Sequence, residues 1–112
     1  MSDDDDEQTR ADFANAVNMT ASALDRWLDT DESKSVGQKS GGSSESTGHA
    51  SGRHIVRILR KKQAEYTDAD RAHMRKVVGY VARHREQRPD GDVHDTAWRY
   101  SLMNWGHDPE AD

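Results

Sequence analysis

The sequence has no cysteine, only two prolines and few aromatic residues among its 112 positions. Without cysteine, the chain can form neither disulfide bonds nor metal sites with thiolate ligands. No stretch reaches the roughly 18 consecutive apolar residues that a membrane-spanning helix requires. The acidic start also lacks the basic and apolar regions of a signal peptide. We therefore expect a cytoplasmic protein with no membrane partner.

Catalytic signatures are also missing. There is no cysteine nucleophile and no Gly-x-Ser-x-Gly motif, and most serines lie in a stretch where a nucleophile could not be held in place. We therefore expect a protein that is not an enzyme and that uses no cofactor.

Charge is distributed very unevenly along the chain. Residues 1–50 carry 4 basic and 11 acidic side chains, residues 51–88 carry 11 basic and 4 acidic, and residues 89–112 carry 1 basic and 6 acidic. A basic middle between acidic ends fits a segment that binds a polyanion. It fits equally well an internal attraction between the three parts of the chain.

Apolar residues recur at helical spacing in five segments, and no segment alternates convincingly like a strand. The spacing predicts a short helix over residues 11–17 and a second helix that begins at Thr20, whose side chain can cap it. A third helix is expected over residues 51–64. The fourth begins at Thr67, with Asp70 completing a capping box, and stops before Pro89. The fifth starts near Asp95.

The fold class predicted from this pattern is all-α: a small bundle of four to five helices with a long Ser/Gly-rich internal loop. Residues 1–10 are expected to be a disordered acidic tail, and residues 11–109 one helical domain. Residues 33–52 hold 7 serines and 5 glycines, a composition typical of a flexible linker. The expected core consists of Trp27, Leu28, Ile55, Leu59, Val77, Val81, Trp98, Leu102 and Trp105.

Basic residues recur at helical spacing in the third and fourth predicted helices. Phosphate recognition needs cations on one surface, and the two helices are separated by a short turn. The candidate nucleic-acid-binding residues are Arg53, Arg57, Arg60, Lys61, Lys62, Arg71, Arg75 and Lys76. The alternative interpretation is a solvated face with ion pairs to the acidic segments, and the sequence leaves both open.

Histidines and the aromatic ending of the chain have simpler explanations. The six histidines lack the i, i+4 spacing of a helical metal site, so we expect caps and surface residues and no metal ligands. The alternative, in which two or three of them converge on a metal in the fold, stays open. Trp98, Leu102 and Trp105 share one helical face and are expected in the core. Tyr100 and Asn104 lie off that face and are left for contacts with a partner.

Several stretches of the sequence resemble domain-of-unknown-function family 3140, an uncharacterised bacterial and archaeal family. They include residues 32–39, 48–49, 51–53, 58–62, 73–81 and 98–109, the last of which is the most specific. Family members are often labelled DNA-binding proteins, and the family implies no catalytic residues. The resemblance also implies that residues 33–39 and 48–53 are family motif, so the flexible Ser/Gly-rich loop is narrowed to residues 40–47.

The function predicted from these observations is non-specific binding of DNA or RNA through phosphate contacts. The alternative is a protein-interaction or regulatory adaptor that uses the acidic tail and the aromatic C-terminal helix. Clustering of the cations on one surface would favour the first, whereas cations scattered and paired with carboxylates would favour the second.

Overall fold

The computed structural model describes the backbone of residues 3–36 and 46–110 and the side chains from residue 6 onward within these ranges. These residues form six α-helices and one short 3-10 helix, with no strand among them. The helices are α1 (Asp3–Ala16), α2 (Ala21–Leu28), α3 (Asp31–Ser35), α4 (Thr47–Arg60), η1 (Gln63–Glu65), α5 (Asp68–Arg85) and α6 (Ala97–Asn104). The predicted all-α fold is thus confirmed. None of the described helices is long and apolar enough to cross a membrane.

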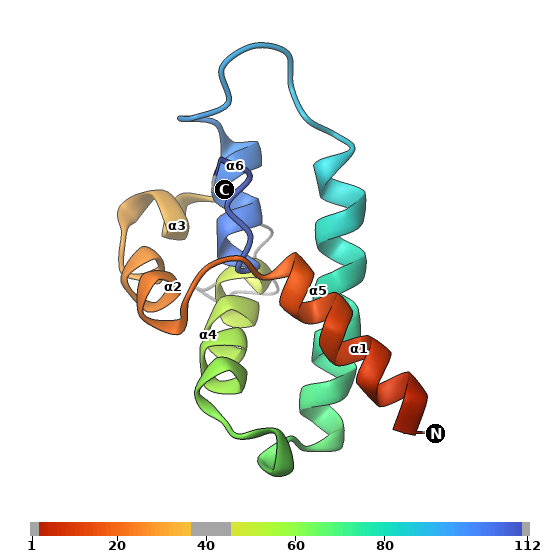
Figure 1. The fold of residues 1–112 in the computed structure, drawn as a ribbon. Coiled ribbons are helices and arrows are strands. Elements are labelled where there is room, and N and C mark those ends of the chain that lie inside the picture. Colours follow the sequence, from red (N-terminus) through yellow and green to blue (C-terminus); the bar gives the residue numbers. More distant parts are fainter. Residues whose placement is uncertain (1–2, 37–45, 111–112) are drawn as a thin grey trace.

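Helices α4 and α5 form the frame of the fold. Figure 1 shows them side by side, joined at one end through η1, with α1 crossing α5 and with α2 against α4. The short α6 packs on α2, α3, α4 and α5. The last helix therefore closes the bundle.

Local capping signals define the helix starts as expected. The Thr20 side chain accepts a hydrogen bond from the backbone N–H of Ala23 at 3.1 Å and caps α2. Thr67 and Asp70 form the predicted capping box of α5, with both reciprocal hydrogen bonds at 3.0 Å. Such caps satisfy N–H groups that have no partner within the helix.

The N-terminal segment differs from the expected disordered tail. The first helix, α1, begins at Asp3, so residues 3–10 are helical in the structure. Carboxylates near a helix N-terminus interact favourably with its dipole. In addition, Asp6 lies 3.8 Å from the guanidinium of Arg71 on α5. An acidic composition alone could not show that α5 provides a partner for this segment.

The start of α4 also differs from the prediction. Of the loop predicted over residues 40–47, residues 40–45 lie outside the described residues, whereas Ser46 caps α4 and Thr47 begins it. The helix thus starts four residues before the predicted residue 51 and ends at Arg60 rather than 64. A Cβ built on Gly52 would stand 2.6 Å from the carbonyl oxygen of Asn104. The small residues of this segment therefore allow two helices to approach closely.

The core matches the predicted set with two exceptions. Leu28, Ile55, Val77, Val81, Trp98, Leu102 and Trp105 are buried, each with an exposed fraction of 9% or less. Trp27 and Leu59 are only partly buried and pack against this cluster. The core also takes in Phe13, Val17, Leu24, Val56, Ile58, Met74 and Val93.

Candidate anion-binding site

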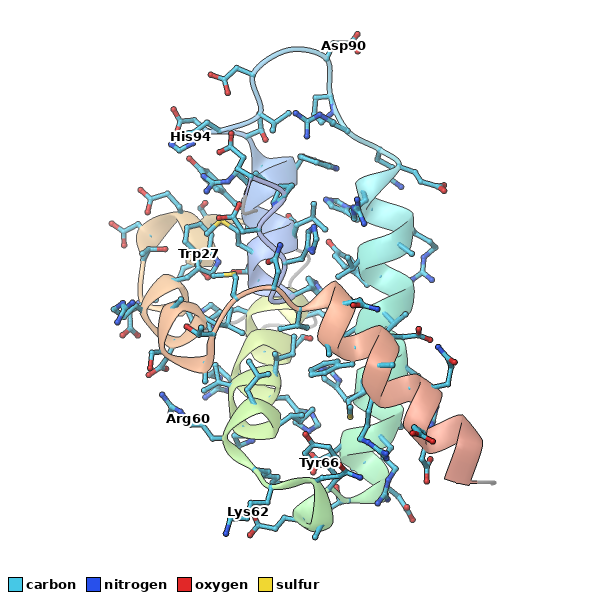
Figure 2. The ribbon with its side chains drawn as sticks, viewed as in Figure 1. Trp27, Arg60, Lys62, Tyr66, Asp90 and His94 are labelled. Atoms are coloured by element: carbon cyan, nitrogen blue, oxygen red, sulfur yellow. The ribbon has the colours of Figure 1, made fainter. Side chains whose placement is uncertain are left out.

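The eight predicted cations do not behave alike. Six of them are exposed: Arg53, Arg57, Arg60, Lys62, Arg75 and Lys76. Lys61 and Arg71 are partly buried and take part in ion pairs within the fold. Figure 2 shows Arg60 and Lys62 extending outward from the end of α4 and the turn that follows it.

Lys61 is held by a buried carboxylate. Its Nζ lies 2.6 Å from Oδ2 of Asp70, whose other oxygen lies 2.8 Å from Nε2 of His54. Burial alone would raise the pKa of Asp70, but hydrogen bonds from Lys61, from the Thr67 N–H and from His54 bring it well below its ordinary value. Asp70 is therefore ionised at neutral pH, and Lys61 serves mainly to neutralise it.

Arg71 and Arg75 face another side of the molecule. Arg71 contacts Asp68 at 3.1 Å and Asp6 of α1 at 3.8 Å. Arg75 is four residues further along α5 and therefore lies on the same side of that helix, toward α1. The sequence left open whether Arg71 shares a surface with the basic residues of α4, and in the structure Arg71 is instead engaged by Asp68 and Asp6.

Arg57 and Lys76, two of the remaining exposed cations, flank a contact between α4 and α5. His73 on α5 stacks on His54 of α4 with ring centres 4.3 Å apart. Burial, together with the charges of His54, Lys76 and Arg57, lowers the pKa of His73 to about 4. Arg57 of α4 and Lys76 of α5 thus act on the same histidine. We call the exposed residues Arg53, Arg57, Arg60, Lys62 and Lys76 the cationic surface.

A column of stacked rings lies between α5 and its neighbours. From one end to the other the rings are those of His54, His73, Trp105, Tyr80, His84 and Trp98. Successive ring centres are 4.2 to 6.2 Å apart, and the planes lie within 22° of each other. The guanidinium of Arg88 caps the column 5.5 Å from the centre of the Trp98 ring. The column thus links side chains of α4, α5 and α6.

A pocket of about 330 Å³ opens beside this column. It is lined by Thr47 and Gly48 of α4, Lys76, Tyr80 and Arg83 of α5, and Ser101, Asn104 and Trp105 at the end of α6. Burial raises the pKa of the Tyr80 phenol, and a hydrogen bond with Ser101 partly offsets this. The charged side chains among the described lining residues are both cations.

The aromatic ending of the chain lies inside the protein. Asn104, expected at a partner surface, is fully buried: it accepts from the indole N–H of Trp27 at 2.8 Å and donates to the carbonyl of Ser33 at 3.0 Å. Tyr100 is partly buried and lies against the ring of Trp27, with centres 5.5 Å apart. The prediction for Asn104 was wrong because the helix packs on two sides, not one.

The sequence matches one known protein family. Residues 12–103 match the family described as "Protein of unknown function (DUF3140)". The chain belongs to the DUF3140 family. No curated protein and no solved structure matches it.

The DUF3140 match covers both basic helices and all of the described pocket lining except Asn104 and Trp105. It spans all of α2, α3, α4 and α5 and ends within α6, one residue before Asn104. In this DUF3140 chain two histidines bind backbone carbonyls within the fold: His49 contacts that of Leu28 at 2.7 Å, and His107 that of Ala16 at 2.7 Å. Among the described residues, no three His, Asp or Glu side chains converge in a way that could hold a metal ion.

Of the residues that line the pocket, only Lys76 and Asn104 are expected from the sequence to make contacts with a partner; Tyr80, Arg83 and Trp105 are among those not anticipated as site residues. Lys76, Tyr80 and Arg83 follow at i, i+4 and i+7, so the helical period places them on one face of α5. That spacing was a usable signal. The position of Trp105 opposite them depends on how α6 packs, which no local pattern reports.

Proposed function

We propose that this protein binds nucleic acid without sequence preference, through phosphate contacts on the cationic surface of α4 and the adjoining face of α5. The observation that carries the proposal is the placement of Arg57 and Lys76, from different helices, around one histidine. Cations from two helices on one exposed surface can contact successive phosphates. Base recognition requires side chains that are held in a fixed position against the base edges, and these exposed cations are not held in that way.

Two features of the fold favour this function over the adaptor alternative. Trp98 and Trp105 are buried, so they cannot act as aromatic anchors on a partner surface. The acidic N-terminal segment, which the adaptor alternative would use for partner contacts, is docked on α5, where Asp6 lies 3.8 Å from Arg71. Arg57, Lys62 and Lys76 are exposed and form no ion pair with any other described residue.

The decisive experiment compares two variants that lose the same charge. Arg57→Gln removes a cation of the proposed surface, whereas Arg26→Gln removes an exposed cation from α2. Binding of a fluorescent duplex is measured by anisotropy at low salt. We expect Arg57→Gln to weaken binding of every sequence alike and Arg26→Gln to leave it nearly unchanged. Equal effects of the two variants, or no binding by the wild type to DNA or RNA, would refute the proposal.

A further inference from the structure

The pocket beside the ring column has a hydrogen-bond donor with nothing to bind. Trp105 is 4% exposed. The indole N–H groups of the other two tryptophans are paired, that of Trp27 with Asn104 at 2.8 Å and that of Trp98 with the carbonyl of His84 at 2.7 Å. Trp105 donates to no group in the part of the chain that the structure describes. A donor that faces a pocket and has no partner within the protein can bind a polar ligand there.

The unpaired donor is directed at the start of α4. A Cβ built on Gly48 would stand 3.1 Å from Nε1 of Trp105. Thr47 and Gly48 are the first two residues of this 14-residue helix, and the first N–H groups of a helix have no partner within it. Thr47, Gly48 and Trp105 all line the pocket, so an acceptor bound there can be reached by N–H groups that have no partner in the helix.

The opposite wall supplies charge. Lys76 and Arg83 stand two turns apart on one face of α5 and both line the pocket. The hydroxyls of Tyr80 and Ser101 lie between these cations and α6. No carboxylate is found among the described lining residues. Donors and positive charge thus surround the pocket, so an anion rich in acceptor oxygens is its complement.

We propose that this pocket binds a phosphate monoester. A monoester carries close to two negative charges and three acceptor oxygens at neutral pH, which matches the two cations and the N–H groups. A diester in a nucleic-acid backbone carries one charge and would leave one cation without a partner. The volume of about 330 Å³ exceeds what a phosphate needs, and the rings of Tyr80 and Trp105, 4.2 Å apart, provide an apolar wall. The ligand therefore carries an organic group of roughly nucleoside size.

The three tryptophan indole signals in a proton–nitrogen NMR spectrum test this assignment directly. Trp105→Phe identifies the Trp105 signal. Adenosine 5′-monophosphate should shift that signal, inorganic phosphate should shift it at higher concentration, and adenosine should not. The signals of Trp27 and Trp98 are already hydrogen-bonded and should stay nearly constant, so they also report that the fold is intact. If none of these probes shifts the Trp105 signal, or if adenosine shifts it as much as the monophosphate, the proposal is overturned.

A matched pair of variants tests the cation. Arg83→Gln should weaken binding of adenosine 5′-monophosphate by at least about tenfold, because it removes a charge-assisted contact. Arg85→Gln removes the same charge two residues along α5, at an exposed position outside this pocket, and should change the affinity less than about twofold. Equal weakening by both variants would mean that only net charge matters, which would overturn the pocket assignment.

The same readout separates the two sources of a phosphate monoester, a free nucleotide and the end of a strand. A short single strand with a 5′-phosphate is compared with the same strand ending in a 5′-hydroxyl. A shift of Trp105 by the phosphorylated strand alone supports the monoester site and identifies the strand end as a source. Equal shifts by both strands would overturn it, since the backbone would then fill the pocket. Binding of closed circular DNA, which has no ends, reports on the cationic surface independently.

Discussion

Ser33 of α3 and Asn104 of α6 exchange two hydrogen bonds in the centre of the protein, although 71 residues separate them. The amide oxygen of Asn104 also accepts from the indole N–H of Trp27. Both Ser33 and Asn104 have an exposed fraction of 0%. One amide thus connects three helices in a region where water cannot replace it.

We expect Asn104→Ala to destabilise the protein strongly. The change leaves buried groups of Ser33 and Trp27 unpaired, and each unpaired buried group costs about 1–3 kcal/mol. The free energy of unfolding should fall by about 3 kcal/mol in urea titrations followed by circular dichroism. Asn15→Ala, at an exposed position of α1, is the control and should have little effect. Similar unfolding midpoints for the two variants would contradict this role of Asn104.

The Asp70 cluster should make stability depend on acid. Because the folded-state pKa of Asp70 is lowered, its contribution to stability is complete above the ordinary value of 3.8 and is lost as the pH falls below it. Asp70→Asn should therefore cost about 3 kcal/mol at neutral pH. The difference from wild type should shrink as the pH falls through 4. Asp68→Asn, at a fully exposed carboxylate, is the control, and a difference for Asp70→Asn that did not vary with pH would argue against the cluster.

Two histidines should titrate on opposite sides of the ordinary value of 6.5. Burial, followed by nearby positive charge, lowers the pKa of His73 to about 4, whereas a hydrogen bond and the charge of Glu110 raise the pKa of His94. Proton NMR titration of the imidazole signals follows both in one sample. In the unfolded chain His73 is protonated at a higher pH than in the folded protein. Its protonation should therefore lower the free energy of unfolding as the pH falls from about 6.5 to 4. A His73 midpoint near 6.5 would mean that it lies in water and not in the ring column.

Two glycines should respond to alanine in opposite directions. In Gly52→Ala the new methyl group would meet the Asn104 carbonyl at 2.6 Å and a Leu28 methyl at 2.7 Å, so α4 would have to move. We expect a loss of about 1–3 kcal/mol. In Gly79→Ala the nearest group is the mobile end of Arg83 at 3.1 Å, and the helix should gain up to about 1 kcal/mol. Thermal melts of both variants measure these changes. A Gly52→Ala variant as stable as the wild type would disprove the close approach of α4 and α6.

The proposed nucleic-acid binding should be steeply dependent on salt. If about four cations of the cationic surface contact phosphates, the logarithm of the association constant should fall with the logarithm of salt concentration with a slope of roughly −4. Arg57→Gln should flatten this slope by about one. Anisotropy titrations at several salt concentrations measure both quantities. A slope near zero would show that binding, if present, does not use phosphate contacts.

Local signals account for the parts of the fold that the sequence predicts well. The cap at Thr20, the capping box at Thr67 and the apolar period of α5 involve residues within a turn of each other, so they can be recognised without tertiary information. The start of α4 could not, because Gly48 and Gly52 read as linker residues until Trp105 and Asn104 are seen to pack against them. Small residues indicate flexibility and close packing equally well in a single sequence.

The candidate site was predictable only in its charge. Helical spacing brings Arg53 and Arg57 to one face of α4, and the structure agrees. Nothing in that spacing could separate Arg57, which is exposed, from Lys61, which neutralises a buried Asp70. The pocket could not be predicted because its walls belong to α4, α5 and α6, whose arrangement follows from packing of the whole chain.

The end of the chain closes the molecule onto its beginning. Arg99 binds Asp108 through two hydrogen bonds of 3.1 Å, the His107 ring contacts the carbonyl of Ala16 at 2.7 Å, and Asp108 pairs with Asn18 across 90 positions. The core likewise needs Trp98, Leu102 and Trp105 from the last helix. During synthesis the earlier helices must therefore wait with their apolar faces uncovered until residues 97–108 have been made. A chain at that stage exposes apolar surface and is prone to aggregation until the last helix can pack.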